Sequence, residues 1–364
     1  MSFEPLPEPP TEVRHRAARA SDAIREWREQ RARKDGHLAT VVPYTGYGST
    51  SWIRVLGRVL LTKDIVQRAD TSSPEGIRGW RSFTSVPVDH AGVIVTVAGQ
   101  RHEVSTDRSG IIDAVVPIEL TPGWHTIGLQ ALNPDPEPTI DRPPNEAQIY
   151  VVAPKAQLGV VSDVDDTIMV TALPRPLLAA WHAFVLNEHS RRPTPGMPVF
   201  YERLTRAYPD APVVYLSTGA WNVAPTLTRF LARNLYPPGP LLLTDWGPTE
   251  DSWFRSGVDH KRKSLERLVD EFPNMKWILM GDDGQHDEEI YGDFVSTHPD
   301  RVAVVCIRQL SPAQAVLAGS AGRTHTAPTE STVPWLYGPD GSVFVEKLHD
   351  LGLLVSDERQ PTVE

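Results

Sequence analysis

The second half of the chain alternates short apolar runs with longer amphipathic stretches, and this alternation limits the possible fold more than any other feature. Buried parallel strands appear as continuous apolar runs because helices cover both faces of their sheet. The stretches between the runs predict helices over 224–234, 261–271 and 288–296. The runs themselves predict the strands Leu158–Ser162, Val213–Leu216, Leu241–Thr244, Trp277–Met280 and Val302–Ile307. We therefore expect an α/β domain with a parallel sheet over residues 155–320.

The first half has a different rhythm, in which short β-branched runs are separated by turn residues. Several short strands at such spacing are typical of a β-sandwich-like domain, expected here over residues 39–154. The predicted strands cover 51–60, 92–97, 102–104, 111–116, 125–129 and 149–152. Residues 1–38 are expected to form a tail and a basic, arginine-rich helix, and residues 321–364 a C-terminal extension. A chain of 364 residues is long enough for two domains.

Composition restricts the class of protein. Hydrophobic residues make up 40% and charged residues 23%, which is typical of a soluble globular protein, and no apolar run approaches the roughly 20 residues of a membrane span. The net charge of −10 argues against a nucleic-acid partner. Cys306 is the single cysteine, so an internal disulfide or a thiolate zinc cluster is excluded. The N-terminus shows no secretion signal, and we expect a cytoplasmic protein that is peripheral at a membrane if its substrate is a lipid.

Polar residues follow three of the predicted strands, at the edge where open α/β sheets bind their ligands. The segment 163–167 follows the first strand, 217–219 follows the second, and 281–287 follows the fourth. Lys261 is expected to open the helix before that fourth strand. These four segments should therefore converge on one crevice.

Phosphoryl transfer through an aspartyl-phosphate requires an ionised carboxylate aimed at phosphorus and a divalent cation that offsets the repulsion between two anions. Asp163 fits the nucleophile. Asp165 fits the acid that protonates the leaving oxygen and later deprotonates water. Ser217 and Lys261 would hold the phosphate oxygens together with backbone N–H groups.

Magnesium prefers oxygen ligands, which the segments 163–167 and 281–287 can supply. The predicted ligands are the Asp163 carboxylate, the Asp165 backbone carbonyl and Asp282, with either Asp287 or Asp283 as a second acid. Further predicted substrate contacts are Thr167, Thr218 and Gly219. For Thr167 the alternative is a hydrogen bond within its own loop.

The DxDxT motif at 163–167, the serine after the second strand, the lysine and the GDxxxxD motif at 281–287 together resemble the haloacid dehalogenase superfamily. The stretches 241–247, 260–261 and 281–291 further resemble the catalytic domain of the actin-patch-associated phosphatidate phosphatase family. This resemblance implies a haloacid dehalogenase-like, Rossmann-like sheet, magnesium as cofactor, and conversion of phosphatidic acid to diacylglycerol. Asp283 and Gln309 depart from the family pattern, which has a serine and an acid there.

Two segments could contact a lipid substrate. Residues 174–206 are longer than a simple crossover and predict a small cap, whose apolar stretch either meets acyl chains or packs on the core. The tract Trp246–Phe254 is expected to be an exposed aromatic loop, and tryptophan is suited to a lipid interface.

Three functions remain open at this point. The first is hydrolysis of a phosphorylated lipid, with phosphatidic acid as the first substrate to test, and the second is hydrolysis of a soluble small-molecule phosphomonoester. The third is a lipid-binding scaffold without turnover. The presence of both Asp163 and Asp165 argues against the scaffold.

Overall fold

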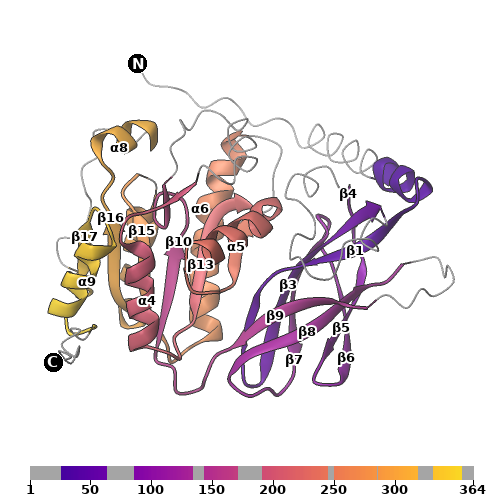
Figure 1. Ribbon diagram of the computed structural model, residues 1–364, viewed down its shortest axis with the longest axis horizontal. Coiled ribbons are helices and arrows are strands. Elements are labelled where there is room, and N and C mark those ends of the chain that lie inside the picture. Colours follow the sequence, from indigo (N-terminus) through magenta and orange to yellow (C-terminus); the bar gives the residue numbers. More distant parts are fainter. Residues whose placement is uncertain are drawn as a thin grey trace, which may run out of the picture. The chain divides into compact units, whose positions relative to one another are not determined.

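The computed structural model describes residues 26–63, 86–133, 143–170, 191–244, 250–284, 286–318 and 331–354 (Figure 1). The chain divides into two compact units. The first comprises Met1–Pro43, Gly57–Asp113 and Gly128–Glu146, and the second comprises Tyr44–Leu56, Ala114–Ile127 and Ala147–Glu364. The second unit therefore contains the predicted α/β region together with two short segments from the first half of the chain.

The described part of the first half is mainly β-structure. Its strands are β1 (His37–Pro43), β2 (Gly46–Ser49), β3 (Trp52–Lys63), β4 (Val86–Pro87), β5 (Gly92–Val97), β6 (Gln100–Ser105), β7 (Ile111–Pro117), β8 (Gly123–Ala131) and β9 (Asn145–Val151). In the first unit β1 and β4 pair antiparallel with β3, and β5 pairs antiparallel with β6 and β8. In the second unit β2 pairs antiparallel with β3 and parallel with β9. The six predicted strands are confirmed.

Sequence patterning missed β2, which contains two glycines in four residues. A Cβ atom at Gly46 would lie 2.3 Å from the carbonyl oxygen of Arg54, and one at Gly48 would lie 2.2 Å from that of Trp52. The close approach of the two backbones thus requires glycine, although glycine normally weakens a strand. Of the predicted basic helix, residues 26–34 are helical and the rest lies outside the described residues.

The second unit is built on a parallel sheet, as predicted. Its six described strands have the order β14-β13-β10-β15-β16-β17, and every neighbouring pair is parallel. The bounds are β10 (Leu158–Asp163), β13 (Val213–Ala220), β14 (Leu241–Thr244), β15 (Lys276–Asp282), β16 (Val302–Arg308) and β17 (Trp335–Gly338). The five predicted strands are confirmed. The short β17 adds a sixth from the segment predicted as a C-terminal extension.

Helices lie between these strands and after the last of them. They are α4 (Met197–Ala207), α5 (Ala224–Arg233), α6 (Glu250–Glu271), α7 (Asp287–Thr297), α8 (Pro312–Ala318) and α9 (Gly341–Asp350), with the short 3₁₀ turns η3 (Trp221–Val223) and η4 (Pro299–Arg301). The strands β11 (Met169–Val170) and β12 (Arg192–Pro193) pair antiparallel in a small separate sheet. Helices α4 and α9 lie side by side (Figure 1), with the rings of Phe200 and Phe344 5.8 Å apart.

The prediction of an exposed loop over Trp246–Phe254 is wrong for its second half, because α6 begins at Glu250. Acidic residues at 250 and 251 suit the first turn of a helix, where the macrodipole favours negative charge. Residues 245–249 lie outside the described part of the chain, as do residues 174–190 of the predicted cap.

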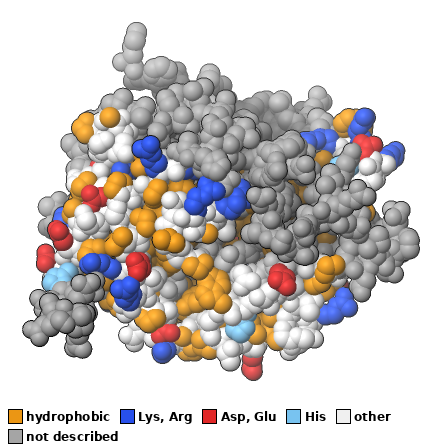
Figure 2. Space-filling view, in the orientation of Figure 1, with side chains coloured by type: hydrophobic (Ala, Val, Ile, Leu, Met, Phe, Trp, Pro, Cys, Tyr) orange, Lys and Arg blue, Asp and Glu red, His pale blue; other side chains and the backbone are white. Residues whose placement is uncertain are grey.

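The second unit has a dense apolar core around the sheet, in which Cys306 is fully buried as a free thiol. Burial raises the pKa of this thiol. None of the described helices is long and apolar enough to cross a membrane. On the face shown in Figure 2, acidic and basic side chains are interspersed, so the net charge of −10 does not produce a uniformly acidic surface there.

Candidate active site

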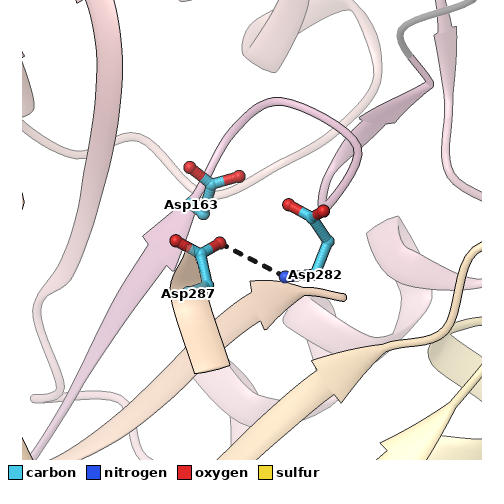
Figure 3. Close-up of side chains that lie close together, drawn as sticks. All are labelled: Asp163, Asp282 and Asp287. Carbon is cyan, nitrogen blue, oxygen red and sulfur yellow. Dashed lines mark hydrogen bonds between the residues drawn. The ribbon is translucent and has the colours of Figure 1, made fainter. Parts of the chain in front are cut away.

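Three buried aspartates meet at the carboxyl edge of the parallel sheet. Asp163 is the last residue of β10, Asp282 is the last residue of β15, and Asp287 is the first residue of α7. Each offers one carboxylate oxygen within 4.8 Å of those of the other two, and each is at most 1% exposed. Figure 3 shows the three carboxylates facing a common space. We refer to these three residues as the acidic cluster.

Lys261 reaches this cluster from α6. Its Nζ donates to Asp163 Oδ1 at 2.6 Å and to Asp287 Oδ1 at 2.5 Å. Burial by itself lowers the pKa of Lys261, but the attraction of the two carboxylates exceeds that effect and raises it overall, so the side chain remains an ammonium. Lys261 was predicted to open its helix. It lies in the middle of α6 instead, because the helix extends back to Glu250.

One ammonium does not balance three carboxyl groups. Burial, and then repulsion from Asp287 and Asp165, raises the pKa of Asp163 well above its usual range even though Lys261 opposes the shift. Burial and the repulsion of Asp287 and Asp163 likewise raise the pKa of Asp282. Within the described residues, Asp163 Oδ2 and Asp282 Oδ2 are buried without a hydrogen-bond partner. Among these residues, the three carboxyl groups of the cluster therefore have only one cationic side chain, Lys261, in contact with them.

This donor set fits a divalent cation. Magnesium takes oxygen ligands, and two carboxylate oxygens that are buried and unpaired within the described residues are suitable donors. A bound cation would also favour the ionised forms of the three acids, whose mutual repulsion it would offset. The fit rests on the chemistry of the donors and on their spacing.

Of the two acids left open for the second position, the structure brings Asp287 into the cluster. Its Oδ2 accepts from the backbone N–H of Asp282 at 3.3 Å. Asp283 is turned toward the loop after β16, where its Oδ1 accepts from the backbone N–H of Leu310 at 2.9 Å. Gly281 makes room for Asp287, because a Cβ atom at position 281 would lie 2.7 Å from the Cβ of Asp287.

Asp165 and Ser217 form a second contact next to the cluster. Ser217 Oγ donates to Asp165 Oδ2 at 3.1 Å and accepts from the backbone N–H of Gly219 at 3.0 Å. Asp165 is half-buried, while Ser217 is fully buried. The structure thus brings the loop after β10 against the end of β13, which extends to Ala220 and therefore contains the residues 217–219 that were predicted to follow it.

The remaining predicted substrate contacts lie in the same two segments. Thr244 Oγ1 donates to the carbonyl oxygen of Thr218 at 2.9 Å and to that of Gly219 at 3.3 Å, which ties the end of β13 to β14. Thr167 is fully buried, and its Oγ1 has no hydrogen-bond partner within the described residues.

Sequence reasoning missed Arg308, which holds the loop after Asp163. Arg308 Nη1 donates to the carbonyl oxygen of Asp166 at 2.6 Å, and Nε donates to that of Pro339 at 3.1 Å. Asp166 has a left-handed backbone with φ of 59°, a conformation that aspartate tolerates better than most residues. The available signal was the position of Arg308 at the carboxyl end of β16, the same rule that identified Asp163.

Comparison with known proteins places this site in a family context. Residues 158–309 match the family described as phosphatidate phosphatase APP1, catalytic domain. Phosphatidate phosphatase APP1 of Saccharomyces cerevisiae is 26% identical over 152 residues, which cover 42% of this chain and 26% of that protein. The uncharacterized protein C29B5.04c of Schizosaccharomyces pombe is 23% identical over 154 residues, which cover 42% and 25%. The match thus spans about a quarter of the length of these curated relatives.

Among solved structures, a carbohydrate acetylesterase from Xanthomonas citri aligns over 75% of this chain and 68% of its own, at 10% identity and a TM-score of 0.27. A similarity this low supports no argument about fold or function. The resemblance to the phosphatidate phosphatase family inferred from the motifs is confirmed by the family match. The segment that carries the acidic cluster, Lys261 and Ser217 is therefore similar to the catalytic domain of phosphatidate phosphatase APP1.

Proposed function

We propose that this protein is a magnesium-dependent phosphatidate phosphatase, which hydrolyses phosphatidic acid to diacylglycerol and phosphate through an aspartyl-phosphate intermediate. The observation that carries the proposal is the buried contact of Lys261 with Asp163 and Asp287 beside Asp282, within the segment matched to a phosphatase catalytic domain. Two unlike sources, local geometry and sequence similarity, thus support the same centre.

In the first step, an oxygen of the Asp163 carboxylate attacks phosphorus, and the bond from phosphorus to the alcohol oxygen breaks. Lys261 donates to Asp163 Oδ1, and this contact fixes the direction in which the carboxylate faces. The Lys261 ammonium also reduces the repulsion between this carboxylate and the anionic substrate. The fixed lysine contact therefore orients the nucleophile.

Asp165 transfers the protons. As a carboxylic acid it gives a proton to the departing alcohol oxygen, and as a carboxylate it then takes one from the water that attacks the aspartyl-phosphate. This second attack breaks the bond between Asp163 and phosphorus and releases phosphate. The hydrogen bond from Ser217 supports this role because it fixes the direction of the Asp165 carboxyl group.

The end of β13 would bind the equatorial phosphate oxygens. The Ser217 hydroxyl, which donates to Asp165 in the structure, would turn to a phosphate oxygen when the substrate binds, and the Gly219 N–H holds its oxygen in place. Thr167 would add a hydroxyl from the opposite loop.

Magnesium would be held by the carboxylates of Asp163, Asp282 and Asp287 and by the backbone carbonyl of Asp165. It would supply positive charge that lowers the repulsion between the acidic cluster and the substrate. We further propose a haloacid dehalogenase-like fold for this unit, a sandwich-like arrangement of the N-terminal strands, and a cytoplasmic protein that acts at the membrane surface.

The test is phosphate release from vesicles of phosphatidic acid, with and without magnesium, by the parent and by Asp163→Asn. We expect the variant to lose activity by a factor of about 10³ or more because no other side chain supplies the nucleophile. Asp300→Asn, an exposed aspartate in η4, is the matched control and should keep parental activity. Activity that survives Asp163→Asn would refute the mechanism. Phosphate release from soluble phosphomonoesters alone would refute phosphatidic acid as the substrate.

A further inference from the structure

A cavity of about 740 Å³ opens at the carboxyl edge of the parallel sheet. Its walls come from β12, the end of β16, the start of α8 and the turn before α9. Sites for small organic ligands enclose about 300 to 1,000 Å³, and open α/β sheets bind ligands at this edge. The cavity therefore has the size and the position of a ligand site.

One wall of the cavity is continuous with the proposed reaction centre. Arg308, which lines the cavity, is the register partner of Asp282 on the neighbouring strand. It also donates to the carbonyl oxygen of Asp166, three residues after Asp163. Arg308 thus connects the cavity wall to the loop of Asp163 and to the strand end that carries Asp282.

The paired strands β11 and β12 make a second connection. Val170 follows the loop that bears Asp163 and Asp165, and it pairs with Arg192 on β12. Both residues line the cavity, and Arg192 is exposed. The loop of the proposed nucleophile therefore leads directly into the cavity wall.

The lining offers hydrogen-bond donors on an otherwise apolar surface. Arg308 uses three of its five N–H groups on the oxygens of Asp166, Pro339 and Gln314. The one carboxylate of the lining, Asp340, accepts from Ser342 and caps the start of α9. Arg192 is the cation of the lining that is exposed to solvent.

Arg308 is less suited to hold a further anion. Its positive charge already lies in the field of the carboxylates of Asp166, Asp282, Asp283 and Asp340. Arg192 therefore contributes the main attraction for a ligand, and Leu310 with three prolines provides apolar walls. Such a lining fits a short carbon frame that carries acceptor oxygens, either ester carbonyls or a carboxylate.

We propose that this cavity holds the alcohol half of the substrate, and that Arg192 selects alcohols bearing acceptor oxygens next to the phosphate. The inference rests on the proposed phosphatase function and specifies the substrate class of that same centre. It predicts that a phosphomonoester with ester or carboxylate oxygens is preferred over a plain alkyl phosphate.

The experiment compares three substrates below the concentration at which they form micelles. They are a short-chain phosphatidic acid with two ester carbonyls, 3-phosphoglycerate with a carboxylate, and an alkyl phosphate without further oxygens. Arg192→Gln should lower kcat/KM for one of the first two substrates about tenfold more than for the alkyl phosphate. The change should appear as a higher KM with kcat unchanged. Arg206→Gln removes an exposed arginine of α4 outside the cavity and should leave all three unchanged.

A selective loss for the phosphatidic acid supports a lipid alcohol, and a selective loss for 3-phosphoglycerate supports a soluble one. An equal loss for all three substrates, or none, overturns the inference. The same ratios are measured as dissociation constants with Asp163→Asn, so that the cavity is tested even if the parent hydrolyses nothing. In that case the proposed function fails while a selective loss of binding still supports the subsite.

Discussion

Helix α6 carries two groups of charged residues that differ in their charge balance. Lys261 in its middle contacts two of the three buried aspartates of the acidic cluster. Glu271 at its end accepts from Arg54 Nη2 at 2.6 Å and from the Tyr47 hydroxyl at 2.7 Å. The Arg54 and Glu271 side chains are 14% and 13% exposed, so they keep some hydration.

The difference separates a site built for chemistry from one built for stability. At Glu271 the carboxylate meets the Arg54 guanidinium and a neutral hydroxyl, and Arg267 lies close enough to act on the same tyrosine, so this group is not short of positive charge. At Lys261 the negative charges exceed the positive ones, and burial raises the carboxyl pKa values. A fold tolerates such an excess of negative charge when a further cation is to be bound there.

Lys261→Met should give the largest change, since it leaves Asp163 and Asp287 buried without their cation. We expect a loss of about 3 kcal/mol in the free energy of unfolding, measured with urea, together with loss of phosphate release. Adding Asp287→Asn should restore part of the stability but not the activity. An unchanged unfolding midpoint in Lys261→Met would show that the cluster is already neutral by protonation.

Magnesium should stabilise the folded protein through the acidic cluster and not through the Arg54–Glu271 pair. At a concentration about 100 times its dissociation constant, a ligand adds about 2.7 kcal/mol to the stability of the folded state. The parent should therefore show a higher Tm with magnesium, and Asp282→Asn should lose this shift. Glu271→Gln, which removes a charge from the C-terminal end of α6, should keep the rise in Tm. An equal loss of this rise in both variants would contradict the assignment of the magnesium ligands.

Substitutions in the Arg54–Glu271 pair should lower stability and leave activity unchanged. Arg54→Met and Glu271→Gln should each cost about 1 to 2 kcal/mol, and a double-mutant cycle should return a favourable coupling energy. Phosphate release per folded molecule should stay at the parental level in both variants. A drop in kcat would mean that this end of α6 also positions Lys261.

The smallest effect is expected for Tyr47→Phe, which removes one hydroxyl donor and keeps the ring. The loss should be about 1 kcal/mol in urea unfolding because one hydrogen bond to Glu271 disappears. The ring also packs against Phe272, with centroids 6.1 Å apart, and this contact is retained. A loss as large as that of Arg54→Met would show that the hydroxyl, rather than the ion pair, is the main bond.

The parallel strands and the residues at their carboxyl ends were predictable because both depend on local pattern. An apolar run followed by an acid identified Asp163 and Asp282 without any knowledge of tertiary contacts. Partners far apart in the sequence were not predictable: the bond from Arg308 to Asp166 spans 142 residues, and that from Arg54 to Glu271 spans 217. The choice between Asp283 and Asp287 also required the fold, since both are acids in one turn-rich segment.

The short strand β17 has a practical consequence for work with this protein. It pairs with β16 along Val305 to Arg308, and it lies beyond residue 309, where the family match ends. A recombinant fragment cut at that residue would expose the backbone N–H and carbonyl groups of an apolar strand, which is a template for aggregation. A fragment that extends to residue 354 keeps β17 and α9 and should remain monodisperse in light scattering, whereas the shorter one should not.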